Sequence, residues 1–300
     1  MNDTIYTNYK NAGKIAAEAR NYGCNLIKPG VSLLDVANKV ESKIIDNGAG
    51  LAFPVNISIN KAAAHFSPRH DTELTFNKGD VVKLDVGAHI DGYIADTANT
   101  VEIGTNNYDK MIESSDRALD RAIQILKPGI DLSDIGRTIE LEIESHGYKP
   151  INNLSGHSLE RYVLHSGISV PNVSGSVVRE KPKVGDVLAI EPFATNGEGR
   201  VISGKGSNIY LCKDTFRSKL IRDIKIKNIF NKIFGKFKTL PFAERWCIDI
   251  IPNGLDIALK KLSFFGLVKH YPQLIEAKDG IVTQKEHTVI INEEGCEVIT

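Results

Sequence analysis

The sequence predicts an α+β fold in which a unit of helices and strands is duplicated, with a helical insertion in the second half. Three observations predict it. A segment beginning Lys28-Pro29-Gly30 recurs without gaps 99 positions later, at Lys127-Pro128-Gly129. A strand after Gly79-Asp80 recurs after Gly185-Asp186, and the region from Cys212 to Tyr271 has no counterpart in the first half. Two repeats are too few for a solenoid, so we expect two halves packed face to face.

Composition narrows the class of protein. The chain has 300 residues, 42% of them apolar and 25% charged, with a formal net charge of zero, so nothing global indicates nucleic acid or membrane. The four cysteines are scattered without CxxC spacing, which argues against disulfides or a cysteine zinc site and favours a reducing cytoplasm. The N-terminus lacks an apolar leader, and no run of 18 apolar residues occurs. We expect a cytoplasmic protein.

The first half should begin with two helices. Apolar residues have helical spacing from Thr4 to Ile27, where Lys28-Pro29-Gly30 ends the helix, and again from Ser32 to Asp46. A strand is expected from Ala52 to Ile59, followed by a loop from Lys61 to Asp71 that carries His65.

A hairpin from Val81 to Ile103 then holds two carboxylates within an apolar pairing. With Asp91-Gly92 as a two-residue loop, Ile90 pairs with Tyr93 and Asp96 lies opposite Gly87. Gly87 shares a face with Asp85, so Asp85 and Asp96 are diagonal neighbours, roughly 7–8 Å apart at the backbone. Two like charges this close repel unless a cation or a proton lies between them. The hairpin therefore predicts a metal site.

The second half repeats the helices, from Tyr108 to Leu126 and onward to about Ser145. Three further groups have ligand chemistry: His157 in a small-residue loop, Glu191 within an apolar run, and Glu286 at the start of a strand between Ile281 and Ile291. Each taken alone suits a structural or solvated role. Together with the aspartates they form an oxygen-rich set suited to two divalent ions. Paired metals suit hydrolysis, because they activate water at neutral pH and polarise a carbonyl.

The set Asp85, Asp96, His157, Glu191 and Glu286, in that order, resembles the metal centre of the methionine aminopeptidases, which have the pita-bread (creatinase/aminopeptidase) fold. The strings LDVGAHIDGYIADTA, SGHSLERYVLHSG, IEPFAT and QKEHTVII carry the resemblance. The long connection between Glu191 and Glu286, with LPFAERW in it, resembles the helical insertion of the type II branch. The resemblance covers essentially the whole chain, without an N-terminal extension, as in the archaeal members.

This resemblance implies a division of the chain. Residues 1–211 and 272–300 would form the catalytic domain, with halves of about 1–106 and 107–211 plus 272–300. Residues 212–271 would form the helical insertion subdomain. The early part of that insertion, Lys213 to Lys238, holds nine Lys and Arg against Asp214 and Asp223.

The resemblance also implies roles. Asp85 would chelate one metal, Asp96 and Glu286 would bridge two, and His157 and Glu191 would complete the second, with Glu191 managing the proton of the attacking water. His65 would lie beside the first peptide bond, and His165 would contact the substrate or stabilise the tetrahedral intermediate. The implied residues of the methionine pocket are Phe53, Leu164 and Ala243. Oxygen and imidazole ligands accept Co, Mn, Fe or Zn, so the identity of the metal stays open.

The implied function is removal of the initiator methionine from nascent proteins when the second residue is small, by metal-activated water attack on the first peptide bond. Implied partners are nascent N-termini and, through the basic segment 213–238, the ribosome; we expect a monomer and no membrane. Two alternatives remain: an Xaa-Pro peptidase of the prolidase and aminopeptidase P type, and a non-catalytic pita-bread protein that binds RNA or ribosomes. The QKEHT string favours the methionine enzyme over the first, and retention of all five ligands argues against the second.

Overall fold

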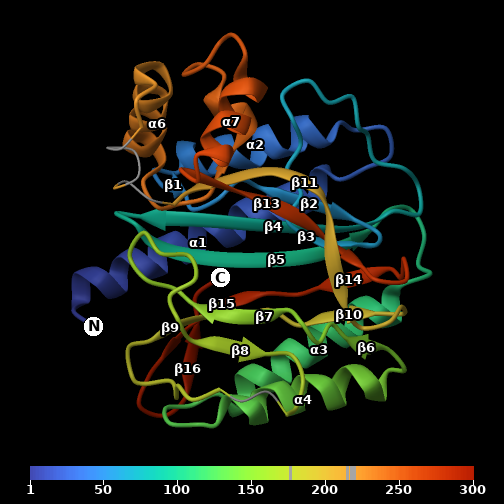
Figure 1. The fold of residues 1–300 in the computed structure, drawn as a ribbon. Helices are drawn as coiled ribbons and strands as arrows, with labels where there is room; N and C mark the ends of the chain where they lie inside the picture. Colours follow the sequence, from blue (N-terminus) through green and yellow to red (C-terminus); the bar gives the residue numbers. More distant parts are fainter. Residues whose placement is uncertain (176–177, 214–215, 217–220) are drawn as a thin grey trace.

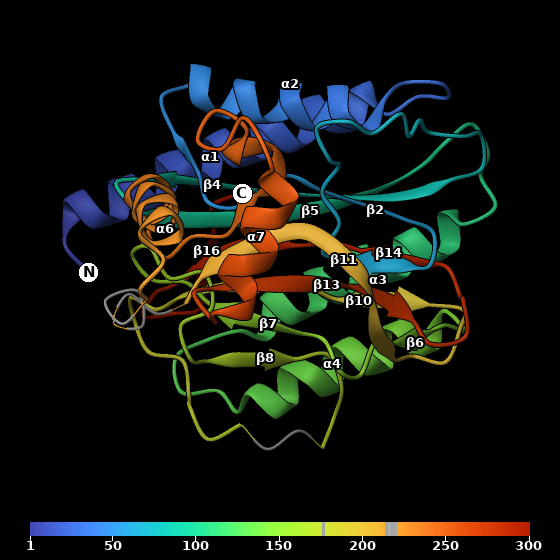
Figure 2. The same cartoon turned by 45° about the horizontal axis from the view of Figure 1, so that its top comes forward.

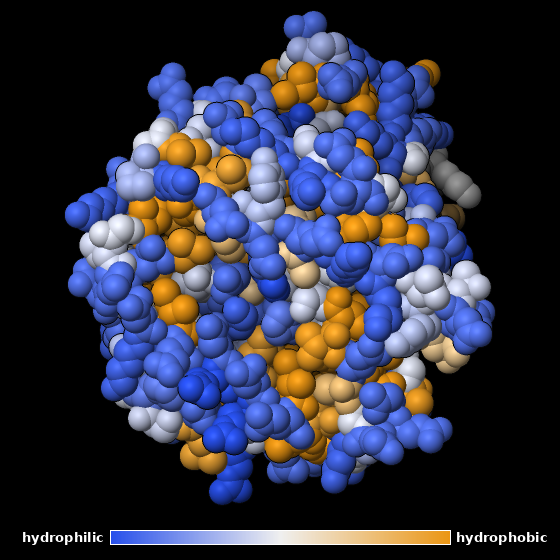
Figure 3. Space-filling view, turned by 180° about the vertical axis from the view of Figure 1, so that it is seen from behind, coloured by the Kyte–Doolittle hydropathy of each residue, from blue (hydrophilic) through white to orange (hydrophobic). Residues whose placement is uncertain are grey.

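A computed structural model describes residues 1–175, 178–213, 216 and 221–300 of the chain. Helices enclose the strands from two sides: α1 and α2 cover one side, and α3 and α4 cover the other (Figures 1 and 2). The fold is therefore α+β with two similar halves, as predicted. None of the described helices is long and apolar enough to cross a membrane. The face opposite to that of Figure 1 is largely hydrophilic, with smaller apolar areas between the polar side chains (Figure 3).

In the first half, helices α1 (Asp3–Leu26) and α2 (Leu33–Asp46) pack on a four-stranded sheet. Its strands are β1 (Gly50–Leu51), β2 (Asn56–Ile59), β4 (Val81–Ile90) and β5 (Tyr93–Glu102). The Asn2 side chain accepts a hydrogen bond from the N–H of Ile5, which caps the start of α1. Small residues then allow α1 to approach the sheet: a Cβ at Gly23 would come within 2.6 Å of the Leu84 side chain.

In the second half, helices α3 (Asp109–Ile125) and α4 (Leu132–Ser145) pack against two further sheets. One has the order β16-β15-β9-β7-β8 and the other the order β14-β10-β6. Their strands are β6 (Lys149–Pro150), β7 (Ser155–Ser158), β8 (Ser169–Pro171), β9 (Val187–Ile190), β10 (Phe193–Thr195), β14 (Val282–Gln284), β15 (His287–Ile291) and β16 (Cys296–Val298).

A fourth sheet, of order β12-β11-β13-β3, joins the insertion to the rest of the molecule. Its strands are β3 (Ala62–Ala64), β11 (Val201–Cys212), β12 (Phe242–Ala243) and β13 (Val268–Glu276). Helices α6 (Ile224–Phe237) and α7 (Leu255–Phe264) and the 3-10 helix η1 (Glu244–Cys247) complete the insertion. Phe230, Ile233 and Leu262 are among the residues of a separate core beneath α6 and α7, which lie together at one end of the molecule (Figure 1).

The predicted hairpin register is confirmed, because Ile90 pairs with Tyr93 and Gly87 with Asp96. Two local predictions were wrong. His157, expected in a loop, lies in β7, which is paired on both edges with β8 and β9. The expected loop from Lys61 to Asp71 contains β3, which pairs with β13 from the end of the insertion. In both cases the decisive partner is far away in the sequence, so local patterns could not reveal the strand.

Candidate metal centre

Both halves deliver carboxylates to one cavity of about 70 Å3 between them. Asp85 and Asp96 come from the paired strands β4 and β5 of the first half. From the second half, His157 lies in β7, Glu191 directly follows β9, and Glu286 directly precedes β15. The structure thus brings all five predicted ligands to the same cavity wall.

The ligand atoms are close enough to share cations. One atom each from Asp96, His157 and Glu286 lie within 4.8 Å of one another. The Nε2 of His157 is 3.8 Å from Oδ2 of Asp96 and 3.6 Å from Oε1 of Glu191. Three buried atoms of the cluster have no hydrogen-bond partner among the described residues: Oδ1 of Asp85, Oδ1 of Asp96 and Nδ1 of His157. Unpaired buried polar atoms are costly, so the two carboxylate oxygens fit divalent cations that would complete their contacts. The Nε2 of His157 faces the same carboxylates and is the ring atom that would join them in binding a cation.

The electrostatics of the cluster lead to the same conclusion. Burial raises the pKa of Asp85 to about 7. Burial also raises the pKa values of Asp96, Glu191 and Glu286 well above the ordinary range, and repulsion from neighbouring carboxylates raises them further. Burial lowers the pKa of His157 to about 3, which keeps its ring neutral and able to coordinate a metal. Divalent cations would restore the ionised form of the acids by supplying the missing positive charge.

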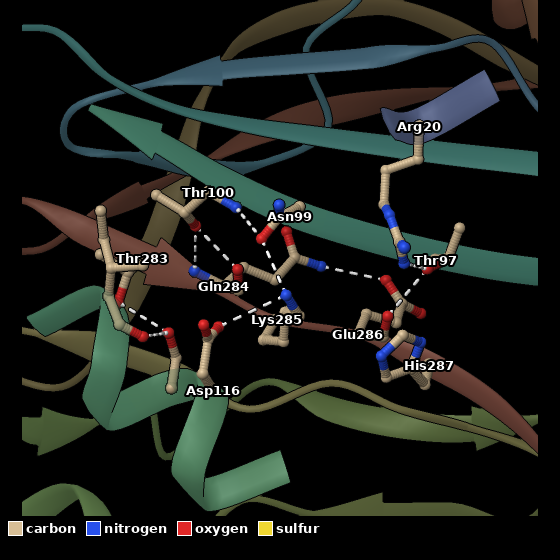
Figure 4. Close-up of polar contacts among 12 residues, drawn as sticks. Arg20, Thr97, Asn99, Thr100, Asp116, Thr283, Gln284, Lys285, Glu286 and His287 are labelled. Atoms are coloured by element: carbon tan, nitrogen blue, oxygen red, sulfur yellow. Dashed lines mark hydrogen bonds and ion pairs between the residues drawn. The ribbon is translucent and has the colours of Figure 1, made fainter. Parts of the chain in front are cut away.

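Hydrogen bonds from both halves hold two of the ligands. The backbone N–H of Asp96 donates to Oγ1 of Thr288 at 2.8 Å, and this hydroxyl donates to the Asp96 carbonyl at 2.7 Å. The side-chain amide of Gln284 donates to Oε2 of Glu286 at 3.2 Å (Figure 4). Thr97 donates to the Glu286 carbonyl at 2.9 Å, and the buried Arg20 of α1 donates to the Thr97 hydroxyl (Figure 4). These contacts restrict the positions of Asp96 and Glu286.

The two predicted histidines also line the cavity. His165 has its ring centroid 4.3 Å from that of His157, and His65 packs edge-on against Tyr271 at 5.3 Å. His65 has φ of 61°, a left-handed conformation that is uncommon outside glycine and clusters at functional sites. Burial lowers the pKa of His65 to about 4 and lowers that of His165, so both rings are neutral at pH 7. Neutral imidazoles can each donate one N–H to a substrate.

The predicted pocket residues divide into two groups. Phe53 and Leu164 line the cavity as expected. Ala243 is not among the residues that line it: Ala243 is fully buried, pairs with Ile209 and directly precedes η1. Pro241, two residues earlier, lies on the wall instead.

Sequence reasoning missed several lining residues, namely Asn56, Ala64, Ile209, Pro241, Tyr271 and Gln284. Gln284 had a detectable signal, since it lies two residues before Glu286 in the same string. Ile209 and Tyr271 had none, because they lie in β11 and β13, whose partners are distant in the sequence.

Comparison with known proteins agrees with this geometry. Residues 7–228 match metallopeptidase family M24. A methionine aminopeptidase from Pyrococcus abyssi is 46% identical over 290 residues, which cover 96% of this chain and 97% of that protein. A methionine aminopeptidase from Thermotoga maritima shares the fold with a TM-score of 0.72 at 22% identity, covering 100% of this chain and 98% of that chain. A thermophilic Arx1 shares it with a TM-score of 0.86 at 16% identity, covering 100% and 91%.

Proposed function

Since the chain belongs to metallopeptidase family M24, as a metal-dependent methionine aminopeptidase, we propose that its buried carboxylates and His157 hold two divalent cations. The ligands would be Asp85, Asp96, His157, Glu191 and Glu286. The observation that carries this proposal is their convergence on one cavity in which two buried carboxylate oxygens, of Asp85 and Asp96, have no hydrogen-bond partner among the described residues. When bound, such cations make water a nucleophile at neutral pH and polarise the carbonyl of the scissile bond. Co, Mn, Fe and Zn all suit the ligand set.

The side chains of the cavity then have separable roles. Glu191 accepts the proton that the attacking water loses, because its carboxylate lies in the cavity beside His157 and would be kept ionised by bound cations. His65 and His165 are neutral at pH 7 and donate their ring N–H groups to the amide that is cleaved. Donors fixed in a buried site favour the negative charge that develops on the carbonyl oxygen.

The methionine side chain is proposed to lie against Phe53, Leu164 and Pro241, which line the cavity with the metal ligands. The second residue is proposed to lie beside His65 and His165 on the wall of the same cavity, where the metal ligands and histidines leave little space for a bulky side chain. This restriction would limit methionine removal to polypeptides whose second residue is small. Activity on an Xaa-Pro bond, as in a prolidase, is the alternative for the same centre.

The substrates would be N-termini of nascent polypeptides, met in the cytoplasm by a monomeric enzyme. The basic segment 213–238 is proposed as a ribosome contact; residues 214–215 and 217–220 of it lie outside the described part. Helix α6 carries Lys225, Lys227, Lys232 and Lys236 and no acidic residue, so it suits salt-sensitive binding to rRNA phosphates. Replacing these four lysines with Gln should abolish sedimentation with ribosomes at low salt, and unchanged sedimentation would exclude the contact.

Release of methionine from Met-Ala-Ser by chelator-stripped protein, with Co or Mn added back, tests the centre. We expect metal-dependent release that Asp96→Ala abolishes and that declines when Leu replaces Ala at the second position. Cleavage of an Xaa-Pro peptide in place of Met-Ala-Ser would support the prolidase-like alternative. Metal-independent release would contradict the proposed centre.

A further inference from the structure

The metal cavity opens into a second, larger hollow of about 690 Å3, called here the outer groove. The cavity and the outer groove share five lining residues, so they are continuous: His65, Leu164, His165, Pro241 and Tyr271. The outer wall adds Tyr162, Leu211, Lys269 and Leu274, among others. A chain that leaves the cavity past the two histidines therefore enters the outer groove.

The charged side chain that lines the outer groove is positive. Among its described lining residues none is acidic, and Lys269 is its one Lys or Arg side chain. Lys269 is exposed, and none of the ion pairs between described residues includes it. Its Nζ lies 4.3 Å from the centroid of the Tyr271 ring, which lines both the cavity and the groove. The positive charge is thus free to meet a ligand at the mouth of the cavity.

Lys269 lines the same groove as His65 and His165, and its charge influences both rings. Burial is the main cause that lowers the pKa values of His65 and His165, and the charge of Lys269 lowers both further. A second cation lies nearby, since Nζ of Lys238 is 3.9 Å from the centroid of the Tyr162 ring, another wall residue. The groove therefore combines apolar walls with a positive potential that begins beside the histidines.

We propose that the outer groove binds the substrate polypeptide beyond its second residue and that Lys269 makes it prefer an acidic third residue. This proposal rests on the proposed function, because it places the scissile bond between the metal ligands and the two histidines. An extended chain advances about 3.3–3.6 Å per residue, and the histidines beside the scissile bond line both the cavity and the groove. We therefore place the side chain of the third residue, the second one past that bond, in the groove. Complementary charge there raises the association rate and the affinity, and salt screens both effects.

The test compares Met-Ala-Glu-Ser, Met-Ala-Gln-Ser and Met-Ala-Lys-Ser as substrates of the metal-loaded enzyme. At low ionic strength kcat/KM should fall in that order, by about threefold to tenfold from the Glu to the Lys peptide, as suits a partly exposed charge pair. The ratio should approach one at a high NaCl concentration, about 0.5 M, where the Debye length is short. Lys269→Gln should flatten the order, and Lys269→Glu should reverse it. Lys278→Gln removes an exposed lysine outside the groove and should leave the order unchanged.

Equal kcat/KM for the three peptides, or an unchanged order in Lys269→Glu, would overturn the proposal. Absence of methionine release from all three would instead contradict the proposed function. Calorimetric binding of the products Ala-Glu-Ser and Ala-Lys-Ser tests the groove without catalysis: tighter binding of Ala-Glu-Ser that Lys269→Glu reverses supports it, and equal binding overturns it.

Discussion

Ala98 and Glu286 form an isolated antiparallel bridge, in which each backbone N–H donates to the other's carbonyl, at 3.4 and 3.1 Å. Ala98 is also the direct partner of Asp85 across the hairpin. Residues that lie opposite one another in a sheet point to the same face, so Asp85 and Glu286 project on the same side from different halves of the chain. The metal centre therefore depends on how the two halves join.

Replacing the carboxylate of Asp96 should weaken metal binding without destabilising the metal-free fold. In the wild type, Mn or Co at 100 times its Kd should raise the free energy of unfolding by about 2.7 kcal/mol. Asp96→Asn should lose most of this rise. Without metal, the variant should be at least as stable as the wild type at neutral pH. The reason is that folding then no longer buries a carboxyl whose ionised form is disfavoured by burial and by the neighbouring acids Glu286 and Asp85. Denaturant unfolding with chelator and with added metal measures both effects, and an equal metal-induced rise in the two proteins would contradict the assignment.

The buried pair Glu41 and Arg245 should be a principal support of the pocket. Glu41 accepts from the Val55 N–H at 3.1 Å and from the Trp246 ring N–H at 2.8 Å, and Arg245 pairs with it. Glu41→Ala should reduce the free energy of unfolding by about 3–5 kcal/mol, because it leaves a buried guanidinium uncompensated. Val55 and Arg245 lie a few residues after Phe53 and Pro241, which line the cavity. Loss of Glu41 should therefore also displace these two wall residues and raise KM for Met-Ala-Ser.

An exposed ion pair provides the control for Glu41→Ala. The Nη2 of Arg161 donates to both carboxylate oxygens of Asp91, but the Asp91 and Arg161 side chains are 58% and 51% exposed. Arg161→Ala, which leaves the Asp91-Gly92 turn intact, should therefore reduce the free energy of unfolding by less than about 1 kcal/mol. Equal losses for the two variants in urea unfolding would show that Glu41 is not a principal support.

Gly87 should be essential for the position of Phe53. A Cβ at Gly87 would lie 2.2 Å from Cε1 of Phe53, closer than any real contact, and the ring is rigid. Gly87→Ala should push Phe53 into the cavity and reduce kcat/KM for Met-Ala-Ser about tenfold to hundredfold. Gly235→Ala, in α6 with no heavy atom within 4 Å of the added Cβ, should retain activity and gain about 0.5–1 kcal/mol in stability. Wild-type kinetics in Gly87→Ala would exclude this role.

Glu276 should make the fold sensitive to acid. Burial by itself would raise its pKa, but four backbone N–H groups donate to the carboxylate and hold its pKa below the ordinary value. Such a group stabilises the fold above its unfolded pKa of about 4.3, and this stability disappears as pH falls through the lower folded pKa. Glu276→Gln should be less stable than the wild type by about 1–3 kcal/mol at pH 7. Urea unfolding should show a smaller difference at pH 3, and a difference independent of pH would contradict the prediction.

Local patterns predicted a large part of the fold. The helical spacing before Lys28 and the recurrence of that segment at Lys127 identified the helices of both halves within a few residues. The Asp91-Gly92 turn sets the hairpin register, and this register places Asp85 beside Asp96. By contrast, the strands β3 and β7 were not predicted, because each forms by pairing with a strand, β13 or β9, that lies elsewhere in the sequence.

The sequence by itself determined which residues are the candidate ligands, because the ligand types, the turn between the aspartates and the period of two along a strand are local properties. Only the tertiary structure decided where the second half meets the first, which is at the bridge between Ala98 and Glu286. It decided that Pro241, and not Ala243, lines the cavity. It also decided that Lys269 stands at the mouth of the cavity. Pairing between distant strands depends on side-chain packing and backbone hydrogen bonds that no short segment contains, so these positions follow from the folded chain as a whole.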